Sequence, residues 1–184
     1  MRIIAGEKRS LKLVAPLGLS TRPTQDKIKE TLFNILAPYI YADSKVLDLF
    51  SGSGALGLEA LSRGAKKAVF VENSKEAAAC IEKNIKTCAY ESKSRIIQKD
   101  AVSAMRILEG SETFDLIFMD PPYGKGLEED ALRYLALSGL LEKEHIIVLE
   151  TERECESDYL EELGFEAFRI KEYKNNKHVF IRKK

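Results

Sequence analysis

Short apolar segments alternate with segments of helical periodicity along most of this chain. Segments such as 45–50, 67–72 and 114–119 have the length and apolar character of buried strands in a parallel sheet. The segments between them repeat apolar residues at three- and four-residue spacing, and Gly or Pro marks where several of them end. Five strand–helix steps of this kind predict an α/β fold with a mostly parallel sheet and helices on both faces.

The expected sheet has seven strands, of which the last two form a hairpin. We expect strands at 45–50, 67–72, 94–99, 114–119, 145–150, 165–173 and 178–182. We expect helices from Thr24 to about Pro38, through Leu58 to Arg63, at 74–88, 101–108 and 127–137, and from the end of the fifth strand to Leu163. Because no helix separates the last two strands, the final strand is expected to run antiparallel.

The N-terminal residues differ in character from the rest of the chain. Residues 2–6 and 11–14 have strand character and flank a polar turn, so we expect residues 1–22 to be a basic β-hairpin extension and residues 23–184 to be the main domain. Residues 1–30 hold seven Lys or Arg against three acidic residues, and residues 171–184 hold six against one. Such basic ends indicate a polyanionic partner, and an ordinary solvated surface is the alternative.

Composition narrows the class of protein. Hydrophobic residues make up 45% and charged residues 32% of the 184 residues, as in a soluble globular protein, and no apolar stretch approaches the roughly 20 residues that span a bilayer. Charged residues at positions 7–9 argue against a secretory signal. Three cysteines without CxxC spacing indicate reduced thiols, so we expect a cytoplasmic protein without a metal site.

A glycine-rich segment directly follows the first strand of the main domain. Gly52, Gly54 and Gly57 form a G-x-G-x-x-G pattern that opens a helix, and Glu72 ends the next strand 20 residues after Gly52. This context is typical of loops that bind a nucleoside-bearing cofactor, with the acidic residue on the ribose hydroxyls. A tight turn with a surface carboxylate is the alternative interpretation.

Two aspartates indicate which cofactor fits. Asp48 precedes the glycines, where its carboxylate would repel a pyrophosphate but attract an ammonium group. S-adenosylmethionine carries an ammonium group and no phosphate. Asp100, followed by Ala101, ends the third strand in a place suited to the adenine amine, and it is also a good helix N-cap.

The tetrapeptide Asp120-Pro121-Pro122-Tyr123 follows the fourth expected strand. Two prolines cannot continue a strand, so they fix the backbone where it leaves the sheet and hold Asp120 at the ligand-binding edge. The Asp120 carboxylate and the Pro121 carbonyl are suited to accept hydrogens of an exocyclic amine, and Tyr123 to stack on the base. A Pro-Pro turn without catalytic meaning is the alternative.

The chain resembles the bacterial RsmD-type 16S ribosomal RNA guanine-N2 methyltransferases. The resemblance rests on Arg2-Ile3-Ile4-Ala5-Gly6, Arg22-Pro23-Thr24, Glu30-Thr31-Leu32-Phe33-Asn34, the segment from Asp48 to Ala60, and Asp120-Pro121-Pro122-Tyr123. It implies a class I, Rossmann-like methyltransferase fold and the methylation of one guanine N2 in small-subunit ribosomal RNA, within an assembled or partly assembled particle. It also implies that the segment near Thr24 closes over the cofactor. Lys27 and Lys29 stand where arginines are common, and Ser51 where alanine is frequent.

The expected site residues fall into three groups. We expect catalysis by Asp120, Pro121, Pro122 and Tyr123. We expect S-adenosylmethionine to be bound by Thr24, Asp48, Phe50, Gly52, Ser53, Gly54, Glu72, Asn73, Asp100 and Ala101. We expect RNA phosphates to be bound by Arg2, Lys8, Arg9, Lys12 and Arg22.

Two rival functions remain open at this point. An N6-adenine DNA methyltransferase shares Asp-Pro-Pro-Tyr, although the chain has no room for a sizeable DNA-recognition domain. A non-catalytic RNA-binding assembly factor could retain a cofactor pocket. The partner expected from the resemblance is 16S ribosomal RNA or the small-subunit particle, and we expect a monomer.

Overall fold

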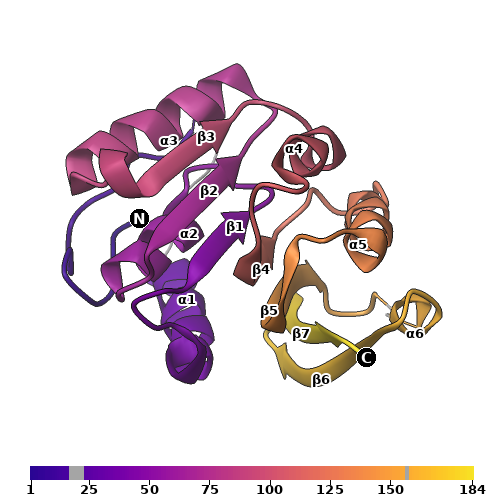
Figure 1. The fold of residues 1–184 in the computed structure, drawn as a ribbon. Coiled ribbons are helices and arrows are strands. Elements are labelled where there is room, and N and C mark those ends of the chain that lie inside the picture. Colours follow the sequence, from indigo (N-terminus) through magenta and orange to yellow (C-terminus); the bar gives the residue numbers. More distant parts are fainter. Residues whose placement is uncertain (17–22, 156–157) are drawn as a thin grey trace.

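The chain forms one seven-stranded sheet with helices on both faces (Figure 1). The structure is a computed structural model that describes residues 1–16, 23–155 and 158–184, with the backbone alone for 23–25. The strands are β1 (Lys45–Asp48), β2 (Lys67–Val71), β3 (Ser94–Ile97), β4 (Phe114–Met119), β5 (Leu141–Glu152), β6 (Phe165–Glu172) and β7 (Asn176–Lys183). The helices are α1 (Pro23–Leu36), α2 (Ala55–Ser62), α3 (Lys75–Cys88), α4 (Ala101–Leu108), α5 (Leu127–Leu137) and α6 (Tyr159–Glu162), with short 3₁₀ turns at Ala37–Tyr39 and Glu91–Lys93.

The strand order places a crevice at the middle of the sheet. The order is β3-β2-β1-β4-β5-β7-β6, with β1 to β5 parallel and β7 antiparallel to both of its neighbours. The direction of winding reverses between β1 and β4, and in open α/β sheets ligands bind outside the carboxyl ends of the strands at such a reversal. The expected class I methyltransferase fold is therefore present, and the crevice lies beside the ends of β1 and β4.

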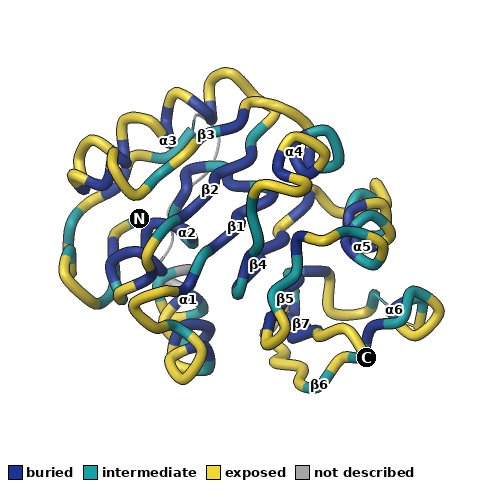
Figure 2. The backbone as a smooth tube through the Cα atoms, viewed as in Figure 1, coloured by how far each residue is buried: buried dark blue, intermediate teal, exposed yellow. Residues whose placement is uncertain are grey.

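Alternation along the strands separates two hydrophobic cores. Val46, Phe118 and Val148 face α1, α2 and α3, whereas Leu47, Ile117 and Leu149 face α4, α5 and α6. Figure 2 shows the consequence, with the central strands buried and the outer turns of the helices exposed. Polar residues at the strand ends alternate between the same two faces. Whether a residue is an odd or an even number of positions from a given core residue therefore indicates which set of helices its side chain faces.

The structure corrects the expected end of the fifth strand and the helix after it. β5 runs to Glu152 because Thr151 and Glu152 still pair with Lys177 and Asn176 of β7. The helix that we expected to extend to Leu163 is confined to the four residues Tyr159–Glu162. Pairing with the antiparallel strand thus takes residues that the sequence pattern assigned to a helix.

The N-terminal residues turn back on themselves but do not form regular strands. Arg2 and Lys12 make a single antiparallel bridge, and the Ile3 amide donates to the Leu11 carbonyl at 2.9 Å. Further pairing is prevented because the amides of Ile4 and Ala5 donate instead to the Glu59 carboxylate of α2, at 2.7 and 3.0 Å. The turn therefore lies against α2.

No helix in the described ranges has the length and apolarity needed to cross a bilayer.

Candidate active site

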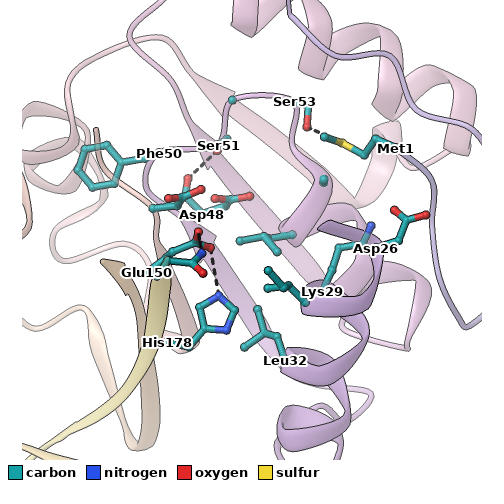
Figure 3. Close-up of a pocket in the computed structure, with 16 residues that line it drawn as sticks. Met1, Asp26, Lys29, Leu32, Asp48, Phe50, Ser51, Ser53, Glu150 and His178 are labelled. Carbon is teal, nitrogen blue, oxygen red and sulfur yellow. Dashed lines mark hydrogen bonds and ion pairs between the residues drawn. The ribbon is translucent and has the colours of Figure 1, made fainter. Parts of the chain in front are cut away.

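A cavity of about 270 Å³ opens at the carboxyl ends of the central strands, on the face covered by α1 and α2 (Figure 3). It is lined by residues from the glycine loop, from the ends of β4, β5 and β7, and from the N-terminal part of the chain. The lining comprises Met1, Asp26, Ile28, Lys29, Leu32, Asp48, Phe50, Ser51, Gly52, Ser53, Ala55, Leu56, Asp120, Glu150, Asn176 and His178. The structure thus brings the expected residues Asp48, Phe50, Gly52, Ser53 and Asp120 to one hollow.

The glycine loop is held by its own backbone and by two carboxylates. The Gly52 amide donates to Glu72 at 2.9 Å, and the Gly57 amide donates to Asp48 at 3.1 Å. A methyl group added at Gly57 would come within 2.4 Å of the Phe70 ring, so this glycine lets α2 pack closely on β2. Gly54, the N-cap residue of α2, is buried. The loop is therefore preformed around the cavity.

Asp48 is an acid that the fold keeps out of water. Its side chain is only 2% exposed, and burial raises its pKa to about 7, with a smaller contribution from the negative charge of Glu72. The hydrogen bond from Gly57 partly opposes this rise in pKa. A buried carboxylate of this kind gains from a positively charged ligand group and repels a phosphate.

The other expected cofactor residues that the structure describes do not line the cavity, and of these Glu72 contacts the glycine loop. Glu72 accepts from the amides of Gly52 and Ser74, and Asn73 beside it is exposed. Asp100 caps α4 by accepting from the Ser103 amide at 2.8 Å, and this hydrogen bond holds its pKa below the usual range. Ala101 is buried in the first turn of α4.

The Asp-Pro-Pro-Tyr corner leaves β4 at the same edge of the sheet. Asp120 lines the cavity, Pro121 is buried, Pro122 is exposed and Tyr123 is 44% exposed. Asp120 keeps an exposed surface in the open cavity, but the protein atoms around its carboxyl group partly desolvate it. This desolvation, followed by the charges of Glu150 and Asp48, raises the pKa of Asp120 well above its ordinary value. The raised pKa makes the Asp120 carboxyl group a more basic hydrogen-bond acceptor than an ordinary aspartate.

Three polar lining residues from β5 and β7 were not among the expected site residues. Glu150, Asn176 and His178 come from β5 and β7, and His178 Nε2 lies 3.1 Å from Glu150 Oε2. Asn176 donates a hydrogen bond to the other oxygen of Glu150. The expected strand 145–150 did end at Glu150, so its parity with Val148 could have placed its side chain on the cavity face. The pairing with His178 depends on the register of the antiparallel hairpin, which the sequence does not specify.

Sequence similarity to known proteins covers most of the chain. A family described as "Conserved hypothetical protein 95" matches residues 1–182. "Ribosomal RNA small subunit methyltransferase D" of Haemophilus influenzae is 41% identical over 156 residues, which is 84% of this chain and 80% of the relative. "Putative rRNA methyltransferase YlbH" of Bacillus subtilis is 40% identical over 157 residues, which is 85% of each chain. The chain belongs to the RsmD family.

Solved structures agree with this assignment to the RsmD family. The "Putative methyltransferase yhhF" of Escherichia coli superposes with a TM-score of 0.83 at 34% identity, covering 100% of this chain and 97% of that chain. The putative methylase HI0767 of Haemophilus influenzae gives a TM-score of 0.80 at 34% identity, covering 98% and 96%. The family resemblance and the Rossmann-like methyltransferase fold expected from the sequence are confirmed.

Of the expected RNA-binding residues of this RsmD family member, Arg2 lies beside the cavity, whereas Lys8 lies at the C-terminal end of α2 and next to the residues that follow α3. Arg2, Arg9 and Lys12 are exposed, and Lys8 is partly buried beside the Tyr90 ring, 5.5 Å from its centroid. Arg2 pairs with the cavity residue Asp26 at 3.1 Å. Arg22 lies outside the described residues, as does the side chain of Thr24, so both of these assignments stay predictions.

Proposed function

We propose that this protein transfers a methyl group from S-adenosylmethionine to the exocyclic N2 amine of a guanine in 16S ribosomal RNA. The observation that carries the proposal is the single cavity shared by the glycine loop, the buried Asp48 and the Asp120 corner. A methyl donor and a base that is taken out of its stack must meet at contact distance, and the cavity adjoins both expected binding regions. Membership of the RsmD family supports ribosomal RNA as the substrate.

The residues of the cavity fit the cofactor. Asp48 is a desolvated carboxylate that gains from the ammonium group, and the loop at Gly52 leaves open space where a side chain would stand. Glu72 can accept from the ribose hydroxyls while it holds the Gly52 amide, since a carboxylate has about four acceptor sites. Asp100, at the end of β3, would accept from the adenine amine while it caps α4. When bound, S-adenosylmethionine supplies an electrophilic methyl group on a positively charged sulfur.

Asp120 and Pro121 would orient the amine. The Asp120 carboxylate and the Pro121 carbonyl would each accept one N2 hydrogen, which turns the nitrogen lone pair toward the methyl carbon. These two acceptors would present N2 to the methyl group that bound S-adenosylmethionine supplies, and N2 would release one proton as it accepts that methyl group. Because the pKa of Asp120 is raised, its carboxylate is also a competent acceptor for that proton.

The surface around the cavity suits a structured RNA. Tyr123 is 44% exposed beside Asp120, so its ring is available to stack on an unstacked base. Arg2, Arg9 and Lys12 lie exposed on the N-terminal turn that begins at Met1 of the cavity wall, where they would contact phosphates. We propose that the substrate is 16S ribosomal RNA or a small-subunit particle, that the protein acts as a monomer, and that it works in the cytoplasm, where ribosomes assemble.

The test is a methyl-transfer assay with three acceptors. Labelled S-adenosylmethionine is supplied with small ribosomal subunits, naked 16S ribosomal RNA or DNA, and the product nucleoside is identified by mass spectrometry. We expect N2-methylguanosine in the RNA of wild-type reactions and none with Asp120→Ala. The same nucleoside should be missing from ribosomal RNA of a strain that lacks the protein. Methyladenine in DNA would instead establish the DNA methyltransferase, and unchanged cellular function of Asp120→Ala would favour a non-catalytic assembly factor.

A further inference from the structure

A second carboxylate lies beside Asp120 in the cavity. β4 and β5 are parallel and pair at Met119↔Leu149, so Asp120 and Glu150 are the next residues on adjacent strands. Neighbouring strands are about 4.8 Å apart, and both side chains line the cavity. Figure 3 shows Glu150 and His178 together on the wall of the cavity nearest β5. A base whose amine reaches Asp120 can therefore be oriented with a neighbouring ring atom toward Glu150.

The Glu150 carboxylate is fixed by side chains from β7 and from the proline corner. His178 Nε2 lies 3.1 Å from one oxygen, Asn176 donates to the other, and the Tyr123 hydroxyl lies 3.5 Å away. His178 is itself 2% exposed, and its Nδ1 lies 3.2 Å from the Tyr173 hydroxyl. Three side chains in contact with Glu150, one of them held in turn by Tyr173, thus determine the direction in which its remaining acceptor sites point.

Glu150 is held in its ionised form although it is largely buried. Burial alone would raise the pKa of Glu150, but the hydrogen bond and positive charge of His178, together with Asn176 and Tyr123, outweigh burial and lower it. The pKa of Asp120 is displaced in the opposite direction. The cavity therefore presents two neighbouring carboxyl groups, of which Glu150 is the permanent acceptor.

Guanine and adenine differ at the position that meets Glu150. Guanine carries two adjacent donors on this edge, the N2 amine and the N1–H group. Adenine carries its N6 amine beside an unprotonated N1, which is an acceptor. With the amine held at Asp120, guanine would donate N1–H to Glu150, whereas adenine would place a lone pair against an ionised carboxylate.

We propose that Glu150 is a specificity-determining residue that selects guanine by accepting its N1–H, and that His178 and Asn176 position the Glu150 carboxylate. This inference rests on the proposed function and deepens it, because it names the residue that distinguishes guanine from adenine. The geometric basis is the row Asp120, Glu150 and His178 across three neighbouring strands, with Glu150 and His178 in direct register.

The test compares two bases at the methylated position. Once mass spectrometry has located the guanine that the wild-type protein modifies, that nucleotide is replaced by 2-aminopurine in the same RNA through ligation of a synthetic fragment. The 2-aminopurine base keeps the N2 amine but has an unprotonated N1. We expect wild-type kcat/KM to favour guanine by roughly 10- to 100-fold. Glu150→Gln should bring this ratio close to one, since a neutral amide can donate to N1 of 2-aminopurine.

Two further variants make the test specific. Glu144→Gln removes the same charge from an exposed position near the other end of β5, and it should keep the wild-type ratio. His178→Gln leaves Glu150 in place but removes its partner, so the ratio should fall by a smaller factor than in Glu150→Gln. Thermal unfolding and S-adenosylmethionine binding are measured for each variant to confirm that it folds.

The outcomes separate this inference from the proposed function. If Glu150→Gln is folded and keeps its preference, or loses activity equally on both bases, Glu150 does not select guanine. If Glu150→Gln does not fold, an unchanged ratio in His178→Gln overturns the inference instead. Guanine methylation by the wild-type protein in either case leaves the proposed function intact. A wild-type protein that methylates no guanine overturns the function, and the inference with it.

Discussion

Two sets of carboxylates lie on the same side of the sheet, the buried Glu59 and the cavity residues Asp48, which is buried, and Asp120, which keeps an exposed surface, and their partners differ. Glu59 of α2 is fully buried and accepts from two backbone amides, from Lys29 at 3.2 Å and from Arg63 at 2.9 Å. Asp48 and Asp120 share one cavity, and within the described part of the chain no Lys or Arg forms an ion pair with either of them. We call Glu59 compensated, because positively charged side chains pair with it, and we call Asp48 and Asp120 uncompensated.

The contrast separates a structural role from a functional one. A compensated carboxylate joins elements, and Glu59 connects the N-terminal turn to α1 and α2 through Lys29 and the amides of Ile4 and Ala5. Uncompensated carboxylates lower the stability of the fold, and they persist where a ligand supplies the missing positive charge or donors. Burial of an acid is therefore uninformative by itself, and its partners indicate its role.

The largest change in stability is expected from Glu59→Gln. This substitution leaves Lys29 and Arg63 buried beside a neutral amide, so the free energy of unfolding should fall by about 3–5 kcal/mol. Chemical denaturation of both proteins measures the difference. The control is Glu82→Gln, which breaks an exposed pair with Lys86 and should not shift the transition measurably. Equal effects in the two variants would remove the distinction that we draw for Glu59.

The largest change in activity is expected from Asp120→Asn. The variant keeps the shape of the corner but loses the acceptor that holds the amine, so kcat should fall roughly 100- to 1000-fold. Its stability should be equal to or higher than that of the wild type, because a carboxyl group close to Glu150 and Asp48 becomes neutral.

A matched control for this prediction lies on the same strand. Asp115 stands near the other end of β4, where it accepts from the Tyr41 hydroxyl at 2.5 Å and from the Lys45 amide at 2.8 Å. Asp115→Asn should keep its methyl-transfer rate and lose about 1–2 kcal/mol of stability. The comparison of the two ends of β4 would be contradicted by a stable, inactive Asp115→Asn or by an active Asp120→Asn.

The sequence predicted those residues of the cavity whose positions depend on local patterns of strand ends and turns. The G-x-G-x-x-G loop, Asp48 and the proline corner follow directly from strand ends and turn residues, and the structure places them at one cavity. Glu150 and His178 could not be paired from the sequence, because their contact is set by the register Glu150↔His178 in an antiparallel hairpin. Glu59 was missed for a similar reason, since its partners Ile4 and Lys29 are distant in the chain.

The pH dependence of stability tests the uncompensated group further. The pKa of Asp48 rises from 3.8 to about 7, so between these values the folded protein binds more protons than the unfolded chain. Rising pH therefore lowers the free energy of unfolding across this window, by at most about 1.4 kcal/mol per pH unit from Asp48. Denaturation between pH 4 and 8 should show a steeper decline in the wild type than in Asp48→Asn, in which Asp120 still acts in this direction and His145, whose pKa is lowered by burial, acts against it. Identical slopes would mean that Asp48 is not protonated in the fold.

The smallest effect is expected at the N-terminal turn, where Lys8 also pairs with Glu7 at 2.9 Å. Arg9 is exposed and Lys8 lies partly buried against Tyr90, so reversing both charges should leave the cavity unaltered and weaken RNA binding. The magnitude of the slope of log affinity against log salt should decrease by about one unit for each phosphate that the protein no longer neutralises.

The control is Lys143→Glu, a substitution at an exposed position near the start of β5, which should retain the wild-type slope. Because S-adenosylmethionine binding involves neither residue, it should be equal in all three proteins. If the Lys8 and Arg9 variant methylates RNA as the wild type does at every salt concentration, the N-terminal turn is not part of the RNA-binding surface.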